Sequence, residues 1–316
     1  MQEKDAVTIE YFEEPVRFAD LVNGFVFHGE QVVSPEDITE LNRVIMKLWR
    51  KAGWLRAQMM IRDLARQVRV GVGAVIVAVE NQSDIHYAMP VRIMNADGAT
   101  YEAQWKKLKK KHRAGRKMKE AEFLSGMLKD DKLIPCFTIV VYFGEEPWDG
   151  PKNLKDMLNL EVLPQQLREM VADYPVNLLE VRKLQHLEYF KTDIQYVFGL
   201  LQNTGNSRML KKYVEEHREQ FTDLEEDVYD VISMMSHSRE LQEIKDKHKT
   251  AQGGIDMCKA IKELIAEGVE QGVEDGIALT KKVYKLQAEG WSAQKIAQEC
   301  GITVEKVKWI LDDSAA

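Results

Sequence analysis

The sequence predicts an α/β protein in which helices flank a central mixed sheet and an α-helical C-terminal region follows. Two short apolar stretches, residues 74–79 and 133–143, are bounded by glycine or proline and predict buried strands. The stretch between them is compatible with a long helix, and alternating strands and helices are typical of α/β proteins. From about residue 194 onward strand signals stop and apolar residues recur at helical spacing.

The first predicted element is a helix over about residues 17–27. Gly29 lies where such a helix can end, and a polar loop follows it. The apolar residues at helical spacing are Phe18, Leu21, Val22 and Phe25.

Residues 61–80 predict a β-hairpin. Three valines alternate along its first half, and two glycines, Gly71 and Gly73, indicate the turn. Its second half is a continuous apolar run, which is typical of a strand buried on both faces.

A helix is expected to begin near Pro90, because proline suits a first helical turn. Gly98 weakens the middle of this helix, which we therefore expect to be shifted or softened. After the strand at 133–143, a helix at 164–172 and a strand at 176–181 are expected.

The chain has 316 residues, enough for one sizeable core and a smaller C-terminal part. We expect a first domain at 1–205, an acidic helical region at 206–277 and a helix-turn-helix-like tail at 278–316. The repeat EGVEQGVEDG near the end of the second region predicts an exposed helix or a linker.

Composition places the chain among ordinary globular proteins, with 45% hydrophobic and 30% charged residues. No stretch approaches the roughly 20 apolar residues that span a bilayer. The N-terminus lacks the basic start and apolar run of a secretory signal, so we expect a cytoplasmic protein without a membrane partner. Cys136, Cys258 and Cys300 are widely spaced, and we expect them to be reduced and structural.

Charge is distributed unevenly along the chain. Residues 41–120 contain 18 Lys or Arg against 6 Asp or Glu. Because the whole chain has a net charge of −7, the remainder has a net charge of −19. A basic segment inside an acidic protein is typical of a local contact with nucleic acid.

Asp63 and Glu80 are the only acidic residues between positions 41 and 83, and the predicted hairpin joins them. Strand alternation places Gln82 on the same face as Glu80. Carboxylates are the ligands that hard cations such as Mg²⁺ prefer, and such a cation can activate water for phosphodiester cleavage. From the residues alone, a strand that ends in solvent explains Glu80 equally well.

Several spaced stretches occur in a recognisable order over roughly residues 1–200. They are RFADLVNGFVFHGEQVVSPEDI, IRDLARQVRV, AVIVAVENQSDIHYAMPVRIM, TYEAQ, AEFLSG and LIPCFTIVVYFGEEPWDGPKNL. In these stretches the chain resembles the recombination-promoting nuclease and putative transposase family of the PD-(D/E)XK nuclease superfamily. The resemblance implies a restriction-endonuclease-like core.

By this resemblance, Asp63 and Glu80 bind Mg²⁺, with Mn²⁺ as a possible substitute, and Gln82 completes the catalytic set. Gln82 occupies the place of the Lys in the superfamily name and brings no positive charge. Loss of such a preorganised donor costs on the order of 2.7 to 4 kcal/mol. Activity is therefore expected to be weak or to depend more on the metal.

A basic run with nine Lys or Arg lies between positions 106 and 119, enough to release several phosphate counterions. A lysine-rich helix end is also often only solvated. Trp105 either packs beneath the run or stacks on a base. Arg92 either contacts a phosphate or pairs with Asp84. The candidate nucleic-acid-binding residues are Arg92, Lys106, Lys107, Lys109, Lys110, Lys111 and Arg113.

The tail has the residue spacing of a helix-turn-helix, with Ser292 and Thr303 as N-caps and Gly301 at the turn. Its second helix has a net negative face, which favours a packing or oligomerising hairpin over DNA reading. A homo-oligomer formed through the C-terminal helices is therefore possible.

Two functions remain after this reading. The first is a Mg²⁺-dependent DNA endonuclease, a hydrolase of phosphodiester bonds linked to recombination or transposition. The second is a weakly active or inactive DNA-binding or assembly protein of mobile-element origin.

Overall fold

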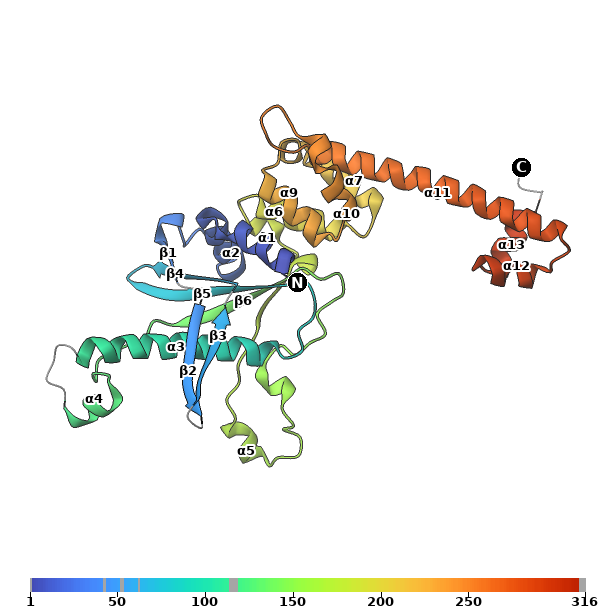
Figure 1. Ribbon diagram of the computed structural model, residues 1–316. Helices are drawn as coiled ribbons and strands as arrows, with labels where there is room; N and C mark the ends of the chain where they lie inside the picture. Colours follow the sequence, from blue (N-terminus) through green and yellow to red (C-terminus); the bar gives the residue numbers. More distant parts are fainter. Residues whose placement is uncertain (1, 42–43, 52–53, 62, 114–118, 313–316) are drawn as a thin grey trace. The chain divides into compact units, whose positions relative to one another are not determined.

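A computed structural model describes residues 2–41, 44–51, 54–61, 63–113 and 119–312 (Figure 1). Five strands form a mixed sheet in the order β1-β4-β5-β6-β7, and β2 and β3 form a separate two-stranded sheet. Helices flank the five-stranded sheet, and a helical C-terminal region follows. The predicted α/β architecture is confirmed.

The sheet combines antiparallel and parallel pairs. Its strands are β1 (Ile38–Glu40), β4 (Leu64–Val70), β5 (Gly73–Gln82), β6 (Cys136–Tyr142) and β7 (Asn177–Glu180). The pairs β1/β4 and β4/β5 are antiparallel, whereas β5/β6 and β6/β7 are parallel. The separate sheet pairs β2 (Val44–Lys51) with β3 (Trp54–Ile61) antiparallel. Because β5, β6 and β7 run in one direction, their carboxyl ends meet at one edge of the sheet.

The predicted hairpin is formed by β4 and β5. Gly71, with φ +56°, makes the tight turn between Val70 and Gly73, which face each other across it. The apolar run forms a strand between β4 and β6, so both of its edges are hydrogen-bonded and most of its side chains are buried. A continuous apolar run is therefore required at this place in the sheet.

Ten helices and five 3₁₀ turns are described before residue 257. The helices are α1 (Gln2–Glu13), α2 (Pro15–Val26), α3 (Met89–Arg113), α4 (Glu120–Ser125), α5 (Gln165–Met170), α6 (Ile194–Asn203), α7 (Ser207–Glu216), α8 (Arg218–Phe221), α9 (Glu226–Met235) and α10 (Arg239–Ile244). The 3₁₀ turns are η1 (Pro35–Asp37), η2 (Leu154–Met157), η3 (Val181–Lys183), η4 (Leu187–Tyr189) and η5 (Lys245–His248).

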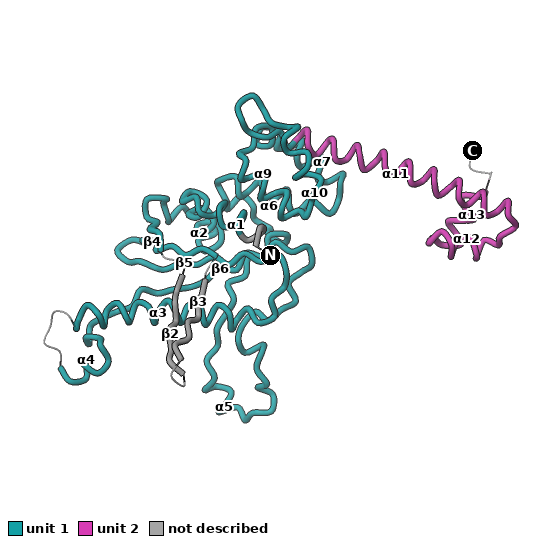
Figure 2. The backbone as a smooth tube through the Cα atoms, viewed as in Figure 1, with its two compact units in different colours: residues 1–257 teal, residues 258–316 magenta. Residues whose placement is uncertain are grey.

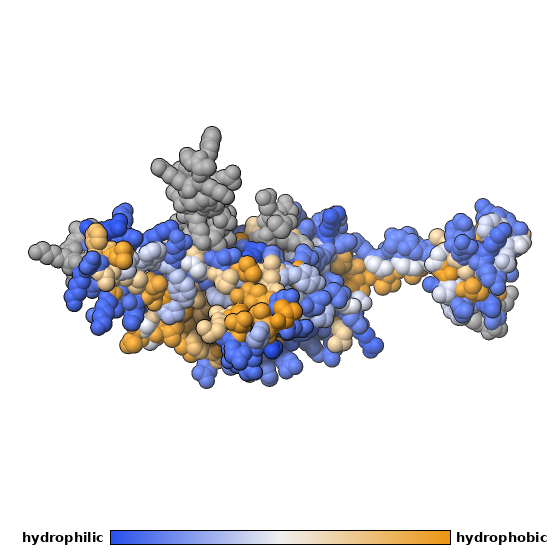
Figure 3. Space-filling view, turned by 90° about the horizontal axis from the view of Figure 1, so that it is seen from below, coloured by the Kyte–Doolittle hydropathy of each residue, from blue (hydrophilic) through white to orange (hydrophobic). Residues whose placement is uncertain are grey.

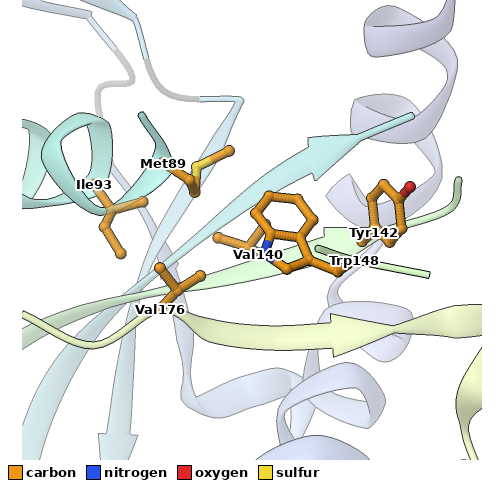
Figure 4. Close-up of a cluster of buried hydrophobic side chains, with 6 residues drawn as sticks. All are labelled: Met89, Ile93, Val140, Tyr142, Trp148 and Val176. Atoms are coloured by element: carbon orange, nitrogen blue, oxygen red, sulfur yellow. The ribbon is translucent and has the colours of Figure 1, made fainter. Parts of the chain in front are cut away.

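Helix α3 covers one face of the sheet, and α1 and α2 lie on the other (Figure 1). Met89 and Ile93, from the first turns of α3, belong to one buried apolar cluster with Val140, Tyr142 and Trp148 (Figure 4). Val140 and Tyr142 are on β6, two residues apart and therefore on one face. This cluster fixes the start of α3 against the middle of the sheet.

The expected softening of α3 is wrong, because the helix runs unbroken from Met89 to Arg113. Gly98 is exposed with open space around it, so its missing side chain leaves no cavity. Two side chains hold the following turns to the chain at the start of β6. The Tyr101 hydroxyl accepts from the Cys136 N–H at 2.8 Å, and the Gln104 amide exchanges two hydrogen bonds with the backbone of Ile134 at 2.8 and 3.1 Å.

Helix α2 is the predicted N-terminal helix, and its polar residues join distant segments. Asp20 accepts hydrogen bonds from the backbone N–H of Thr192 at 2.8 Å, and Asn23 accepts from the N–H of Val33 at 2.9 Å. A side chain at Gly24 would begin 2.5 Å from the Phe190 ring. Asp20, Asn23 and Gly24 belong to the stretch RFADLVNGFVFHGEQVVSPEDI. In the structure this stretch therefore serves the packing of α2.

Arg17, also on α2, is buried with only 8% of its side chain exposed. Its Nε lies 3.0 Å from Asp193, its Nη2 lies 3.0 Å from Glu225, and its Nη1 bonds to Asp227. Asp193 directly precedes α6, and the two other acids lie at the start of α9. One guanidinium therefore connects α2 with the N-termini of two later helices.

The chain divides into two compact units, residues 1–257 and 258–316 (Figure 2). The three-part division expected from the sequence stays a prediction. The second unit contains almost all of α11 (Met257–Ala288), with α12 (Ala293–Cys300) and α13 (Val304–Leu311). Both predicted N-caps are confirmed, since Ser292 accepts from the N–H of Lys295 and Thr303 from that of Lys306. In the described part of the chain, no helix is long and apolar enough to cross a membrane.

Candidate active site

Asp63 and Glu80 lie on adjoining chain segments. Asp63 occupies a bend directly before β4, and Glu80 belongs to β5. Leu64 pairs with Val79, and these are the chain neighbours of Asp63 and Glu80. The Asp63 carboxylate also accepts a hydrogen bond from the N–H of Asn81 at 2.9 Å, which holds it against β5.

Glu80 is almost completely buried, with 2% of its surface exposed. A buried carboxylate is costly unless it is paired and hydrogen-bonded. Arg92 supplies the partner, because its Nη2 lies 2.7 Å from Oε2 of Glu80. Since Arg92 is on α3, this contact places Glu80 on the α3 face of the sheet.

Of the two alternatives for Arg92, the pairing with Asp84 is therefore wrong, since among the described residues Arg92 pairs with Glu80, and the phosphate contact stays a prediction. The pairing follows from the position of Arg92 one turn into α3, above β5. Its side chain keeps 41% of its surface exposed. Arg92 can thus neutralise Glu80 with one nitrogen and present others to solvent.

Gln82 lies two residues beyond Glu80 and therefore on the same face. It ends β5 at the shared carboxyl edge, is half-buried and pairs in register with Tyr142. Glu80 and Gln82 thus share the face that strand alternation predicts, and Asp63 is bonded to the next residue of β5. The roles of all three stay a prediction.

Glu180 is a polar residue at the same edge that the sequence reading missed. It pairs in register with Tyr142 and ends β7 as Gln82 ends β5. Its carboxylate accepts from the N–H of Trp148 at 3.0 Å and from Lys183 at 2.9 Å. The signal was present in the sequence, because an acid is the second-last residue of the predicted strand at 176–181.

Glu180 should make stability depend on pH. Burial alone raises the pKa of Glu180, but the bonds from Lys183 and Trp148 lower its pKa below the usual value. An acid with a depressed folded pKa stabilises the protein above its unfolded pKa, and this stability is lost as pH falls through the folded pKa. Glu180→Gln should therefore cost about 1 kcal/mol at pH 7 and almost nothing at a low pH where Glu180 is protonated in the folded protein.

Urea unfolding of wild type and Glu180→Gln at both pH values measures this difference. Glu161→Gln, at an exposed position, serves as the control. If Glu180→Gln lost the same free energy of unfolding at pH 7 and at low pH, the stabilising role of the ionised Glu180 would be contradicted.

The carboxyl edge has a negative electrostatic environment. Burial raises the pKa of Tyr142, and the carboxylates of Asp84 and Glu180 raise it further. Negative charge around a group that would itself become negative disfavours its ionisation. Of these acids, Glu180 is in turn paired with Lys183 at 2.9 Å.

Asp97 is a second buried acid that the sequence reading missed, 1% exposed in the middle of α3. It accepts from Thr138 at 2.8 Å and from Cys136 at 3.4 Å, and it bonds to Tyr174. Burial, followed by the bond to Asp97, raises the pKa of Tyr174. These contacts hold α3 on β6, so Asp97 has a structural role.

The basic run occupies the C-terminal half of α3. The side chains of Lys106, Lys107, Lys110, Lys111 and Arg113 are exposed, whereas Lys109 is half-buried. The ammonium group of Lys109 lies 5.1 Å from the Trp105 ring, and the indole N–H donates to Ser125 at 2.9 Å. Trp105 thus packs beneath the run. The end of the run at 114–118 lies outside the described residues.

The donor set fits a magnesium ion by its chemistry. Mg²⁺ is usually bound by one or two carboxylates together with waters and substrate phosphates. Asp63 and Glu80, on neighbouring segments at the same end of the hairpin, supply such a pair. No group of three or more His, Cys, Asp or Glu that could hold a metal occurs among the residues that the structure describes. Comparisons with protein-family models, with curated proteins and with solved structures found no match.

Proposed function

We propose that the protein is a Mg²⁺-dependent DNA endonuclease of the PD-(D/E)XK type that acts in the cytoplasm in recombination or transposition. The observation that supports it most is that Asp63, directly before β4, accepts a hydrogen bond from the residue after Glu80, while Glu80 lies on the face covered by α3. The acids at the carboxyl edge supply negative charge for a metal, and the basic half of α3, which extends past the start of β6 at Ile134 and Cys136, supplies positive charge for DNA.

Each residue at this edge has a distinct task in the proposal. Asp63 and Glu80 hold the metal, which polarises the scissile phosphate and lowers the pKa of the attacking water. The Gln82 amide orients the water or the phosphate by hydrogen bonds. Arg92 neutralises Glu80 before the metal binds, and its exposed nitrogens then face the phosphate.

The exposed lysines of α3 provide the path for the DNA backbone. Lys107→Ala, Lys110→Ala and Lys111→Ala combined should weaken binding to all DNA sequences alike. The slope of log K against log salt should fall by about 0.9 for each lysine that contacts a phosphate. Fluorescence anisotropy at several salt concentrations measures both effects.

A matched control removes exposed lysines elsewhere, at Lys211, Lys212 and Lys249. It should leave the slope unchanged. Equal slopes for the α3 variant and wild type would contradict the proposed contact between these lysines and the DNA backbone.

A catalytically weak or inactive DNA-binding or assembly protein is the second candidate, favoured by one observation. Gln82 stands where the superfamily has Lys, so the edge lacks that positive charge. Purified full-length protein is incubated with supercoiled plasmid and Mg²⁺, Mn²⁺ or EDTA. Nicking with a metal but not with EDTA supports the endonuclease. Binding at low salt without cleavage under any metal supports the second candidate.

A further inference from the structure

Helix α11 exposes apolar side chains along much of its length. Its 32 residues extend over roughly 48 Å, and every residue from 266 to 278 is exposed. Val269 is 62% exposed, Val273 56% and Ile277 50%. Figure 3 shows apolar residues along one side of this rod and hydrophilic residues along the other.

The apolar residues form one stripe. With 3.6 residues per turn, the members of this stripe fall within an arc of roughly 80°. They are Ala266, Val269, Val273, Ile277, Thr280 and Tyr284. A row of glycines, Gly268, Gly272 and Gly276, runs along one flank with open space around it. The stripe is thus apolar, and its glycine flank allows a neighbouring backbone to approach closely.

The glycines make this helix weak if it stands alone. Each glycine in a helix interior costs about 0.8–1.0 kcal/mol relative to alanine. Most helical stability in proteins comes from packing of an amphipathic face. Between residues 266 and 278 the stripe is exposed, so a second surface packed on it would supply this stability.

Charges on the other flank of the stripe indicate which surface this is. Glu267 and Glu270 lie on that flank in the N-terminal half of the stripe, Lys281 and Lys285 lie on it in the C-terminal half, and Glu274 lies between the two groups. In an antiparallel pair of identical helices, each flank meets the same flank of its partner running in reverse. Acidic residues then meet basic ones. A parallel pair would set this flank against the uncharged glycine row.

We propose that α11 pairs antiparallel with α11 of a second copy of this chain. With the twofold axis near residue 275, Val273 lies opposite Ile277 and Ala266 lies opposite Tyr284 of the second copy. Glu270 and Glu267 then lie near Lys281 and Lys285 of the second copy. The interface is isologous, so one stripe and one charged flank complete it. This inference is independent of the nuclease proposal.

Sedimentation velocity of the full-length chain tests the pairing. Wild type should sediment as a dimer of about twice 36.4 kDa. Val273→Glu with Ile277→Glu should shift it to monomer, whereas Gln271→Glu with Asp275→Glu, on the opposite side of the helix, should leave the dimer intact. A wild-type chain that stays monomeric at all accessible concentrations overturns the proposal.

Charge reversal tests the antiparallel orientation. Glu267→Lys with Glu270→Lys gives the flank four lysines beside Glu274, and Lys281→Glu with Lys285→Glu makes it wholly acidic. Each variant alone should be monomeric with unchanged helix content by circular dichroism, and an equimolar mixture should form a heterodimer. Reversed variants that remain homodimers, or a mixture that stays monomeric, would refute the antiparallel pair.

Discussion

Replacing Asp63 by Asn should reduce Mg²⁺-dependent plasmid cleavage at least about 100-fold. A bound metal contributes several kcal/mol of transition-state stabilisation, and each 1.4 kcal/mol is about tenfold in rate. Asn keeps an oxygen that can accept from the N–H of Asn81, so the chain segment stays against β5. The effect should therefore fall on metal binding and leave the fold intact. Plasmid nicking rates at saturating Mg²⁺ measure it.

The control for this experiment is Glu161→Gln, which removes one exposed carboxylate far along the chain. It should cleave at the wild-type rate. Thermal unfolding of Asp63→Asn should match wild type closely. Undiminished cleavage by Asp63→Asn would remove Asp63 from the catalytic set.

The largest expected loss of stability comes from Arg17→Ala. Removing one partner of a buried ion pair costs about 3–5 kcal/mol, because the remaining charge stays buried without compensation. Here Asp193 and Asp227 would lose a guanidinium that bonds to both. Burial already raises the pKa of Asp193, and the positive charge of Arg17 opposes that rise. The free energy of unfolding in urea should fall accordingly.

Arg69→Ala is the matched control for Arg17→Ala. Arg69 donates two hydrogen bonds to Asp37, at 2.9 and 2.7 Å, but its side chain is 67% exposed. Exposed ion pairs contribute about 0–1 kcal/mol. Equal losses for the two variants would show that burial of Arg17 contributes nothing beyond a surface pair.

Local pattern was sufficient to predict the hairpin that positions the candidate site. Gly71 supplies the positive φ of the turn, and the apolar run after Gly73 requires a strand with neighbours on both sides. Together they fix the register of β4 and β5, and so the juxtaposition of Asp63 and Glu80. The helix caps at Ser292 and Thr303 were predictable for the same reason, since each depends on residues within one turn.

Tertiary contacts were not predictable in this way. The pairing of Arg92 with Glu80 depends on how α3 crosses β5, and the burial of Asp97 depends on Thr138 and Tyr174. The weakening expected from Gly98 did not break α3, since contacts to β6 outweigh about 1 kcal/mol of helix propensity. Spacing along the chain contains no information on such partners.

The most direct test of the central claim is a search for metal in crystals grown with Mn²⁺. The account predicts an anomalous peak within coordination distance of carboxylate oxygens of both Asp63 and Glu80, and no such peak in crystals of Asp63→Asn. Manganese bound only elsewhere, with Glu80 still paired to Arg92, would contradict it.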